Sequence, residues 1–283
     1  MKDRERIEQV LNTTIRAMHP LSGGMIGEVY RVDFSDGQSV VAKVTQGTDA
    51  TLDIEGRMLR YLAEHSVLPV PEVLHADANL LIMRYIKHAG SISPTVETDA
   101  AQHIAALHSI SAPRYGLEFD TLIGSLHQPN TPDDSWIDFF REQRLFYMAR
   151  IAYEAGQLPL RTRQRIEQFA MMLEDYLFEP DAPSLIHGDL WGGNVLSHQD
   201  KIAGFVDPAI YYAHDEIELA FSTLFSTFGT TFFDVYQQYR PIEANFFNER
   251  RNLYNLYPLL VHVHLFGGGY IGQVERILQQ FGY

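Results

Sequence analysis

The segment that begins at residue 185 constrains this chain more than any other feature. It reads Leu-Ile-His-Gly-Asp-Leu-Trp-Gly-Gly-Asn-Val-Leu and, after a short spacer, Ala-Gly-Phe-Val-Asp-Pro-Ala. Asp189 and Asn194 are five positions apart, and Asp207 follows thirteen positions later. In a kinase catalytic loop, an Asp accepts the proton of the attacking hydroxyl, an Asn five positions on binds a metal ion, and a second Asp binds metal from the end of the next strand. The pattern therefore predicts Asp189 as the catalytic residue and Asn194 and Asp207 as metal ligands.

A glycine-rich stretch near the N-terminus is the second part of the pattern. Residues 21–30 read Leu-Ser-Gly-Gly-Met-Ile-Gly-Glu-Val-Tyr, which indicates a turn between two strands. Backbone amides in such a turn can approach phosphate oxygens. A glycine-rich hairpin is a weak signal alone, but its position upstream of the 185–207 segment predicts Gly23, Gly24 and Gly27 as part of a nucleotide site.

A lysine and a glutamate follow in the order that this chemistry requires. Val40-Val41-Ala42-Lys43-Val44 reads as a strand whose alternation separates the lysine from its apolar neighbours. An ammonium there reaches the α- and β-phosphates of a nucleotide. Twelve residues later, Glu55 opens a helical pattern, so we expect it to pair with Lys43. The four residues Met-Arg-Tyr-Ile at 83–86 are the expected hinge, in which Arg84, Tyr85 and Ile86 bind adenine through the main chain.

The order of strand and helix patterns predicts an α+β, bilobal, protein-kinase-like fold. We expect an N-lobe over residues 1–86, with a five-stranded antiparallel sheet and one helix packed on it. A mostly helical C-lobe is expected over residues 87–283. The strands are expected at 14–21, 28–34, 38–45, 72–76 and 80–85, and the helices at 2–12, 50–65, 95–110, 134–155, 160–178 and from 215 onwards, with an interruption at 267–269.

Two stretches of the predicted C-lobe need separate interpretation. Residues 116–136 contain Pro, Asn and Asp and are too long for a simple connection, which is typical of a functional loop. The aromatic residues Phe225, Phe228, Phe232 and Phe233 are expected in the core. His262 and His264 are two positions apart in a helical pattern and so do not share a helical face, which argues against a metal site.

Composition excludes several classes of function. The formal net charge is −14 at pH 7, and no cluster of Lys and Arg provides the basic face that nucleic-acid binding needs. The chain has no cysteine, so disulfides, thiolate catalysis and Cys-based zinc sites are excluded. The charged N-terminal residues lack the apolar core of a secretion signal, and no apolar run approaches membrane-spanning length. We therefore expect a cytoplasmic protein that binds neither membranes nor nucleic acid.

The motifs together resemble the fructosamine-3-kinase (ketosamine kinase) family, a branch of the protein-kinase-like superfamily close to aminoglycoside and choline kinases. The resemblance covers nearly the whole chain. Its most specific part is His-Gly-Asp-Leu-Trp-Gly-Gly-Asn at 187–194 followed by Asp-Pro-Ala at 207–209. Residues 211–220, 123–130 and 265–270 also look like this family, as do Trp136 and the Phe pair at 139–140.

This resemblance implies ATP-dependent phosphorylation of the sugar 3-hydroxyl of a ketosamine, such as a fructosamine or ribulosamine adduct of an amine or a protein lysine. The 3-phosphate makes the adduct unstable and the amine is released, so the implied role is deglycation repair of proteins. ATP and Mg²⁺ are the implied cofactors. Ketosamine small molecules or glycated proteins are the implied partners, and the protein is expected to be a monomer or a weak dimer. Trp191, His214 and Tyr270 are the expected substrate contacts.

Some of these residues have a plain structural alternative. Trp191 can stack on the sugar, or it can wedge the catalytic loop as a core aromatic. His214, Glu216 and Glu218 begin a helix, where they favour a brace for the catalytic loop over ligand contact. His187 favours a structural role in the loop. Family members usually carry an acidic residue at the position of Arg84, and this departure concerns side-chain contacts to the nucleotide rather than main-chain recognition of adenine.

Two other functions stay open at this point. The first is another small-molecule hydroxyl kinase, acting on an aminoglycoside, choline or a plain sugar. The second is a non-catalytic pseudokinase that binds ATP and acts through a partner. A pseudokinase typically lacks one of the Lys, Asp or Asn positions, and this chain has all three.

Overall fold

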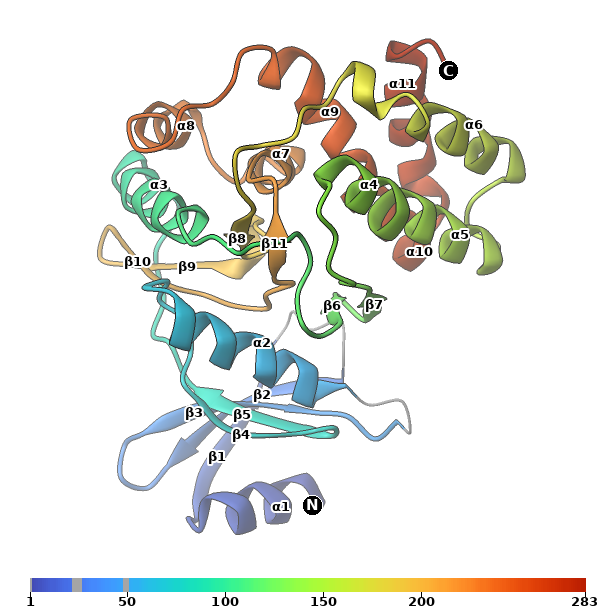
Figure 1. The fold of residues 1–283 in the computed structure, drawn as a ribbon. Coiled ribbons are helices and arrows are strands. Elements are labelled where there is room, and N and C mark those ends of the chain that lie inside the picture. The colour runs from blue at the N-terminus through green and yellow to red at the C-terminus, as the bar shows by residue number, and fades with distance from the viewer. Residues whose placement is uncertain (1, 22–26, 48–50) are drawn as a thin grey trace.

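The N-terminal part of the chain is built on one antiparallel sheet. The computed structural model describes residues 2–21, 27–47 and 51–283. The sheet has five strands in the order β1-β2-β3-β5-β4, which confirms the predicted sheet (Figure 1). Its strands are β1 (Ile15–Pro20), β2 (Glu28–Phe34), β3 (Ser39–Val44), β4 (Val73–Asp77) and β5 (Leu80–Arg84).

Two helices cover opposite faces of this sheet, where the sequence predicted only one. Alternate residues of β3 and β5, including Val40 and Ile82, join a buried cluster with Ile7 of α1 (Lys2–Leu11). The residues between them, including Leu81, face α2 (Leu52–His65) and its buried Leu59. Figure 1 shows α1 and α2 on opposite sides of the sheet. Because side chains alternate across a strand, Lys43, which pairs with Leu81, falls on the face that α2 covers. This register is what brings Lys43 to Glu55.

The C-terminal part is mostly helical, as predicted. Short segments of 3-10 helix lie at Leu173–Asp175, Gly192–Asn194 and Gly268–Tyr270. The α-helices are α3 (Pro94–His108), α4 (Trp136–Phe140), α5 (Tyr147–Glu154), α6 (Leu160–Ala170), α7 (Glu216–Leu224), α8 (Thr230–Tyr236), α9 (Arg251–Tyr254), α10 (Leu256–Phe266) and α11 (Ile271–Gln280). The break predicted at 267–269 falls between α10 and α11.

The expected helix at 134–155 contains a local irregularity. Its middle, Arg141–Phe146, is π-helical and joins α4 to α5. The fully buried Arg144 lies in this segment, donates to the Pro129 carbonyl at 2.7 Å and stacks over the Tyr211 ring. A second π-helical segment, Phe246–Arg250, precedes α9. π-Helical turns are frequent near functional sites. The first of these two segments, through Arg144, connects the helical part to the 116–136 stretch.

Three two-stranded sheets, which the sequence analysis did not predict, lie between the large sheet and the helices. They pair β6 (Thr121–Ile123) with β7 (Leu126–Gln128), β8 (Ser184–Ile186) with β11 (Tyr211–Ala213), and β9 (Val195–His198) with β10 (Lys201–Phe205). The strands have three to five residues each, too short for a clear alternation signal. They hold the predicted catalytic loop between them.

The helical part has one large apolar core. Trp136, Phe139 and Phe140 of α4 are fully buried in it, and Trp136 Nε1 donates to the Tyr254 hydroxyl at 2.9 Å. That hydrogen bond satisfies the polar atom that a buried indole carries. Among the described residues, no helix combines the length and the apolar character needed to cross a bilayer.

Candidate active site

Lys43 connects the sheet to the catalytic segment. Its Nζ lies 2.8 Å from Glu55 Oε1 and 2.7 Å from Asp207 Oδ1. The side chains of Lys43 and Glu55 are both 8 % exposed. Burial by itself lowers the pKa of Lys43, but the two carboxylates outweigh burial and raise it above its ordinary value. Lys43 is therefore a fixed cation at the point where the two parts of the molecule meet.

The predicted catalytic loop follows β8, and position 188 near its start can hold only a glycine. Gly188 has φ +83°, and a Cβ at this position would lie 2.0 Å from the Ala209 carbonyl oxygen. The turn brings Asp189 to Asn194, whose Nδ2 donates to Asp189 Oδ2 at 2.8 Å and to the Asp189 carbonyl at 2.9 Å. This arrangement leaves Asn194 Oδ1 as the remaining acceptor of the carboxamide.

Asp207 sits in a strained backbone conformation beside this loop. Its φ is +53°, in the left-handed region that non-glycine residues rarely adopt. The Val206 amide just before it donates to the Asn194 carbonyl at 3.1 Å, which ties the two predicted metal ligands together. Strain of this kind persists where the surroundings enforce it and is typical of functional sites.

The protonation of Asp189 is set by its surroundings. The pKa of this carboxyl is raised to about 7, mainly by burial, and the hydrogen bond from Asn194 opposes that rise. The carboxylates of Asp207 and Glu218 contribute to the rise, because like charges disfavour ionisation. A cation bound at Asp207 reverses that part of the effect. Asp189 is thus poised near neutrality, as a proton acceptor needs to be.

Glu218 of α7 holds the catalytic loop from behind. Its carboxylate accepts hydrogen bonds from the Gly188 amide at 2.6 Å, the His187 amide at 3.2 Å and His108 Nε2 at 2.8 Å. Burial raises the pKa of Glu218, but these donors outweigh burial and lower it overall. These contacts fit the expectation from the sequence that Glu218 supports the catalytic loop. His187, for which a structural role was expected, is fully buried in the loop.

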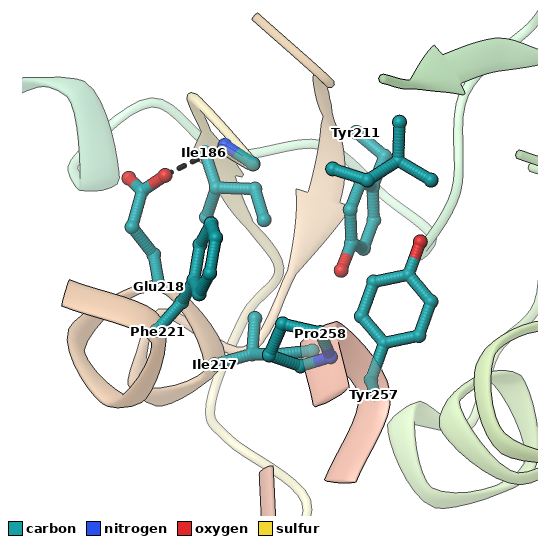
Figure 2. Close-up of a pocket in the computed structure, with 9 residues that line it drawn as sticks. Ile186, Tyr211, Ile217, Glu218, Phe221, Tyr257 and Pro258 are labelled. Atoms are coloured by element: carbon teal, nitrogen blue, oxygen red, sulfur yellow. Dashed lines mark hydrogen bonds between the residues drawn. The ribbon is translucent and has the colours of Figure 1, made fainter. Parts of the chain in front are cut away.

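A small cavity separates this brace from α10. Figure 2 shows Glu218, Phe221 and Ile217 of α7 on one side and Tyr257 and Pro258 on the other, with Tyr211 closing the space. The cavity measures about 10 Å³, which is room for at most one water molecule. Because the loop is closely packed on the side of Glu218, Asp189 and Asn194 can contact a ligand only on the opposite side, here called the front of the loop.

The front of the loop faces a cleft of about 930 Å³ between the sheet and the helices. Met83, Arg84, Tyr85 and Ile86 line its sheet side. The Tyr85 amide already donates to the Ser39 carbonyl at 3.2 Å. Within the described part of the chain, the Ile86 amide makes no hydrogen bond. The cleft thus presents a free main-chain donor at the predicted hinge.

The cleft brings together most of the predicted site residues. Its lining includes Lys43, Glu55, Arg84, Tyr85, Ile86, Asp189, Trp191, Asn194, Asp207 and Tyr270. Gly23 and Gly24 lie outside the described residues. Gly27 has φ +71°, and a Cβ there would lie 2.1 Å from the Val44 carbonyl oxygen, so its backbone packs closely on β3.

His214 requires a correction as a substrate contact. It is 4 % exposed and does not line the cleft. Its ring packs edge-on against Trp136 and Phe178, and its Nδ1 is 3.0 Å from Asp215 Oδ1. The structural role, which the sequence analysis weighed first, fits this environment because a side chain enclosed by core aromatics cannot reach a ligand in the cleft.

Several lining residues were missed by sequence reasoning. Phe225 was expected in the core but is 38 % exposed and lines the cleft, whereas Phe228 and Phe232 are buried. Ile123 and Gly124, at the β6–β7 turn, also line it. So does His262, which the sequence analysis considered only as a metal ligand. The available signal was the 116–136 loop, whose length indicated function without indicating which residues face the cleft.

The two-lobed fold and the grouping of Lys43, Glu55, Asp189 and Asp207 in one cleft define a kinase-like phosphotransferase. Solved aminoglycoside phosphotransferases share this fold. The ADP-bound enzyme APH(2″)-Ib is 18% identical, with a TM-score of 0.65, and the match covers 97% of this chain and 95% of that one. At this identity the likeness shows the fold alone.

Within this class, the chain belongs to the fructosamine kinase family, whose family model matches residues 2–282. A relative from Synechocystis sp., named a probable ketoamine kinase, is 32% identical over 96% of this chain and 94% of its own. The chloroplastic protein-ribulosamine 3-kinase of Arabidopsis thaliana is 31% identical over 80% and 68%. A solved structure from Thermobifida fusca, named a putative fructosamine-3-kinase, is 28% identical with a TM-score of 0.86, over 98% of this chain and 96% of that one.

Proposed function

We propose that this protein transfers the γ-phosphoryl group of ATP, bound with Mg²⁺, to the 3-hydroxyl of a ketosamine and so starts deglycation of amines or protein lysines. Family membership supports the reaction class. The observation that carries the mechanism is the lysine bridge: Lys43 Nζ contacts Glu55 and Asp207 at 2.8 and 2.7 Å in the cleft that also holds Asp189. Positioning and charge stabilisation are the main demands of phosphoryl transfer, and this bridge meets both.

The sheet side of the cleft suits the nucleotide. The Ile86 amide is free to donate to adenine, while the Ile86 carbonyl is occupied by His88 Nδ1 at 3.0 Å. The Tyr85 amide is bonded to Ser39, so Ile86 rather than Tyr85 is the proposed main-chain donor. Lys43 faces the α- and β-phosphates, and Glu55 fixes the direction of its ammonium.

The donor set at the proposed metal site fits Mg²⁺. Asp207 offers a carboxylate and Asn194 offers Oδ1, since its Nδ2 is bonded to Asp189. Over the described ranges, no group of three His, Asp or Glu side chains could hold a metal ion alone. This suits an ion that uses one or two protein ligands together with phosphate oxygens and water. When bound, Mg²⁺ neutralises charge on the transferring phosphate.

Asp189 accepts the proton in the proposed reaction. The sugar oxygen bonds to the γ-phosphorus while the bond from that phosphorus to the β–γ bridging oxygen breaks, and ADP leaves. The hydroxyl proton passes to Asp189, whose orientation is fixed by Asn194 at 2.8 Å. Trp191, 41 % exposed in the cleft two residues on, provides a flat surface for the sugar.

The direct test is a substrate panel with ATP·Mg²⁺ that includes ribuloselysine, fructoselysine, choline and aminoglycosides, followed by measurement of ADP. Mass spectrometry of the ribuloselysine reaction should locate the phosphate on the 3-oxygen of the sugar. Turnover of choline or an aminoglycoside with neither ketosamine would refute the proposal in favour of another small-molecule kinase. Tight ATP binding without transfer to any acceptor would favour a pseudokinase.

The cytoplasmic location and the monomeric or weakly dimeric state also remain proposals. Both are expectations from the sequence alone. Cell fractionation tests the first. Sedimentation at several protein concentrations tests the second, because a weak dimer dissociates on dilution.

A further inference from the structure

A row of exposed and partly buried aromatic side chains continues the cleft beyond Trp191. The Trp191 ring is 6.3 Å from Phe225, and Phe225 is 4.9 Å from His262. His262 in turn lies 5.6 Å from Phe266 and 5.0 Å from Tyr270. These five residues, here called the aromatic wall, all line the cleft. The wall starts two residues from Asp189 and is not explained by phosphoryl transfer itself.

Besides the Tyr270 hydroxyl, the wall contains an acceptor nitrogen on His262, whose ring is held in place by a hydrogen bond. His262 Nδ1 donates to the Pro258 carbonyl at 2.7 Å, so this nitrogen carries the proton of the neutral ring. Burial lowers the pKa of His262, and the hydrogen bond to Pro258 opposes this only in part. The imidazole is therefore neutral at neutral pH. Its Nε2 has a lone pair and no hydrogen-bond partner among the described residues.

The charge around this acceptor is also unusual. The described residues that line this end of the cleft, around Phe221, Pro258, Val261 and Leu265, include no Lys, Arg, Asp or Glu. Aromatic faces attract cations through their quadrupole, more strongly when water is displaced. A neutral hydrogen-bond acceptor among aromatic faces is complementary to an ammonium group that can donate an N–H.

The wall also leads toward solvent. Phe266, at its far end, is 57 % exposed, and Phe225 is 38 % exposed. If the reacting sugar lies beside Asp189 and Trp191, the wall offers the amine-bearing side of a ketosamine a path to solvent. That side must reach solvent when the amine belongs to a protein. The secondary amine of a ketosamine is largely protonated at neutral pH, and it donates N–H groups.

We propose that the aromatic wall is the subsite for the secondary ammonium of the ketosamine, with His262 Nε2 accepting its N–H and the faces of Phe225 and Tyr270 stabilising its charge. This inference rests on the proposed function. It adds that the enzyme distinguishes ketosamines from plain ketoses by binding their secondary ammonium group. His262 is then a specificity-determining residue that binds substrate without taking part in proton transfer.

The test compares an N-propyl ketosamine with the 1-O-propyl ether of the same ketose, which keeps the 3-hydroxyl but has no ammonium. We expect the wild-type KM to be about tenfold lower for the amine than for the ether. His262→Phe keeps a ring but removes the acceptor, and Phe225→Leu removes an aromatic face. Each should raise KM for the amine severalfold, leave KM for the ether and for ATP unchanged, and leave kcat within twofold.

Two variants serve as controls. His262→Gln retains an acceptor near the position of Nε2 and should keep much of the preference for the amine. Phe247→Leu alters an aromatic residue that is 41 % exposed but does not line the cleft, and should change nothing. Equal KM values for amine and ether in the wild-type enzyme would overturn the inference, and this result does not depend on any variant folding.

Equal losses for amine and ether in His262→Phe would also overturn it, because they indicate contact with a sugar hydroxyl instead. The proposed function fails separately, if neither the ketosamine nor the ether is phosphorylated. Phosphorylation of both with the same KM leaves the kinase reaction standing and removes only the ammonium subsite.

Discussion

Lys43 Nζ and Asp207 Oδ1 lie 2.7 Å apart, although 164 residues separate them in the chain. The contact joins β3 of the sheet to the segment after β10 of the helical part. Glu55 holds the same ammonium at 2.8 Å from the other side. A single cation thus connects two carboxylates from different parts of the molecule, and its loss has separable consequences for stability and catalysis.

The Lys43→Met variant should be both inactive and destabilised. It leaves Glu55 buried without a partner, and breaking a buried ion pair costs about 3–5 kcal/mol. Without Lys43, burial keeps the pKa of Glu55 raised above its unfolded value, so the folded variant binds a proton that the unfolded chain releases. The free energy of unfolding of the variant, measured in urea, should therefore fall relative to wild type as pH rises from 5 to 8.

The matched control is the double variant Lys43→Met/Glu55→Leu. Replacing both partners with apolar groups is often neutral for stability, so most of the lost free energy of unfolding should return while phosphoryl transfer does not. Recovery of activity in the double variant would contradict the proposed role of Lys43 at the phosphates. A Lys43→Met variant as stable as wild type would contradict the buried ion pair.

The Asp189→Asn variant should have a much lower kcat and, at neutral pH, a higher free energy of unfolding than wild type. Loss of the proton acceptor is expected to lower kcat by about 10²- to 10⁴-fold with little change in KM for ATP. The pKa of Asp189 is about 7 in the folded protein and lower when unfolded, so ionisation costs folding free energy that is absent at low pH and fully present above 7. Asn carries no such cost, and the variant should gain stability relative to wild type as pH rises from 5 to 8.

The pH profile of the wild-type enzyme provides the check. The acceptor must be deprotonated, so kcat/KM should fall as pH drops below the pKa of Asp189, and bound Mg²⁺ should shift this limb to lower pH because a cation favours the carboxylate. A flat profile between pH 5 and 8, together with unchanged kcat in Asp189→Asn, would exclude Asp189 as the base.

The residues that carry the proposed reaction could be predicted from sequence because the loop that holds them is local. Asp189 and Asn194 are five positions apart and are brought together by one turn, so spacing alone is informative. The same holds for the sheet, where the alternation in β3 correctly separated Lys43 from the apolar face. The second helix on the sheet, α1, was predicted as a helix, but its packing against the sheet was not predicted. An amphipathic pattern shows that a helix has an apolar face without showing which surface that face contacts.

The front of the cleft could not be predicted in the same way. Phe225 and Phe232 are both aromatic residues in a helical region, yet one is 38 % exposed and the other fully buried. Their difference depends on tertiary packing that sequence periodicity does not encode. His214 shows the converse, since its place beside a motif suggested ligand contact while its ring is enclosed by Trp136 and Phe178.

The Arg84→Ala variant should have nearly normal affinity for ATP. The Arg84 guanidinium bonds to Glu72 at 3.2 Å and to Gln38 at 2.8 Å, and the Arg84 and Glu72 side chains are 43 % and 66 % exposed. Exposed pairs of this kind contribute about 0–1 kcal/mol to stability, and adenine is proposed to bind the main chain of Ile86. We expect less than about a twofold change in KM for ATP. A tenfold increase would show that the Arg84 side chain contacts the nucleotide.

The pair Gly192→Ala and Gly193→Ala should separate the role of Trp191 from that of the loop backbone. A Cβ on Gly193 would lie 2.3 Å from the Trp191 ring, whereas a Cβ on Gly192 meets nothing within 4 Å. Gly193→Ala must therefore displace the indole that is proposed to support the sugar, and Gly192→Ala leaves it in place.

We expect KM for the ketosamine to rise by about tenfold in Gly193→Ala, a loss of about 1.4 kcal/mol, with KM for ATP unchanged. Both KM values should stay near wild type in Gly192→Ala. Steady-state kinetics with each substrate varied in turn gives the comparison, and the tryptophan emission of Gly193→Ala should shift with the ring. A loss of stability in Gly193→Ala with equal increases in KM for ATP and for the ketosamine would mean that Trp191 only wedges the loop. Equal kinetics in the two variants would contradict the proposed support of the sugar by Trp191.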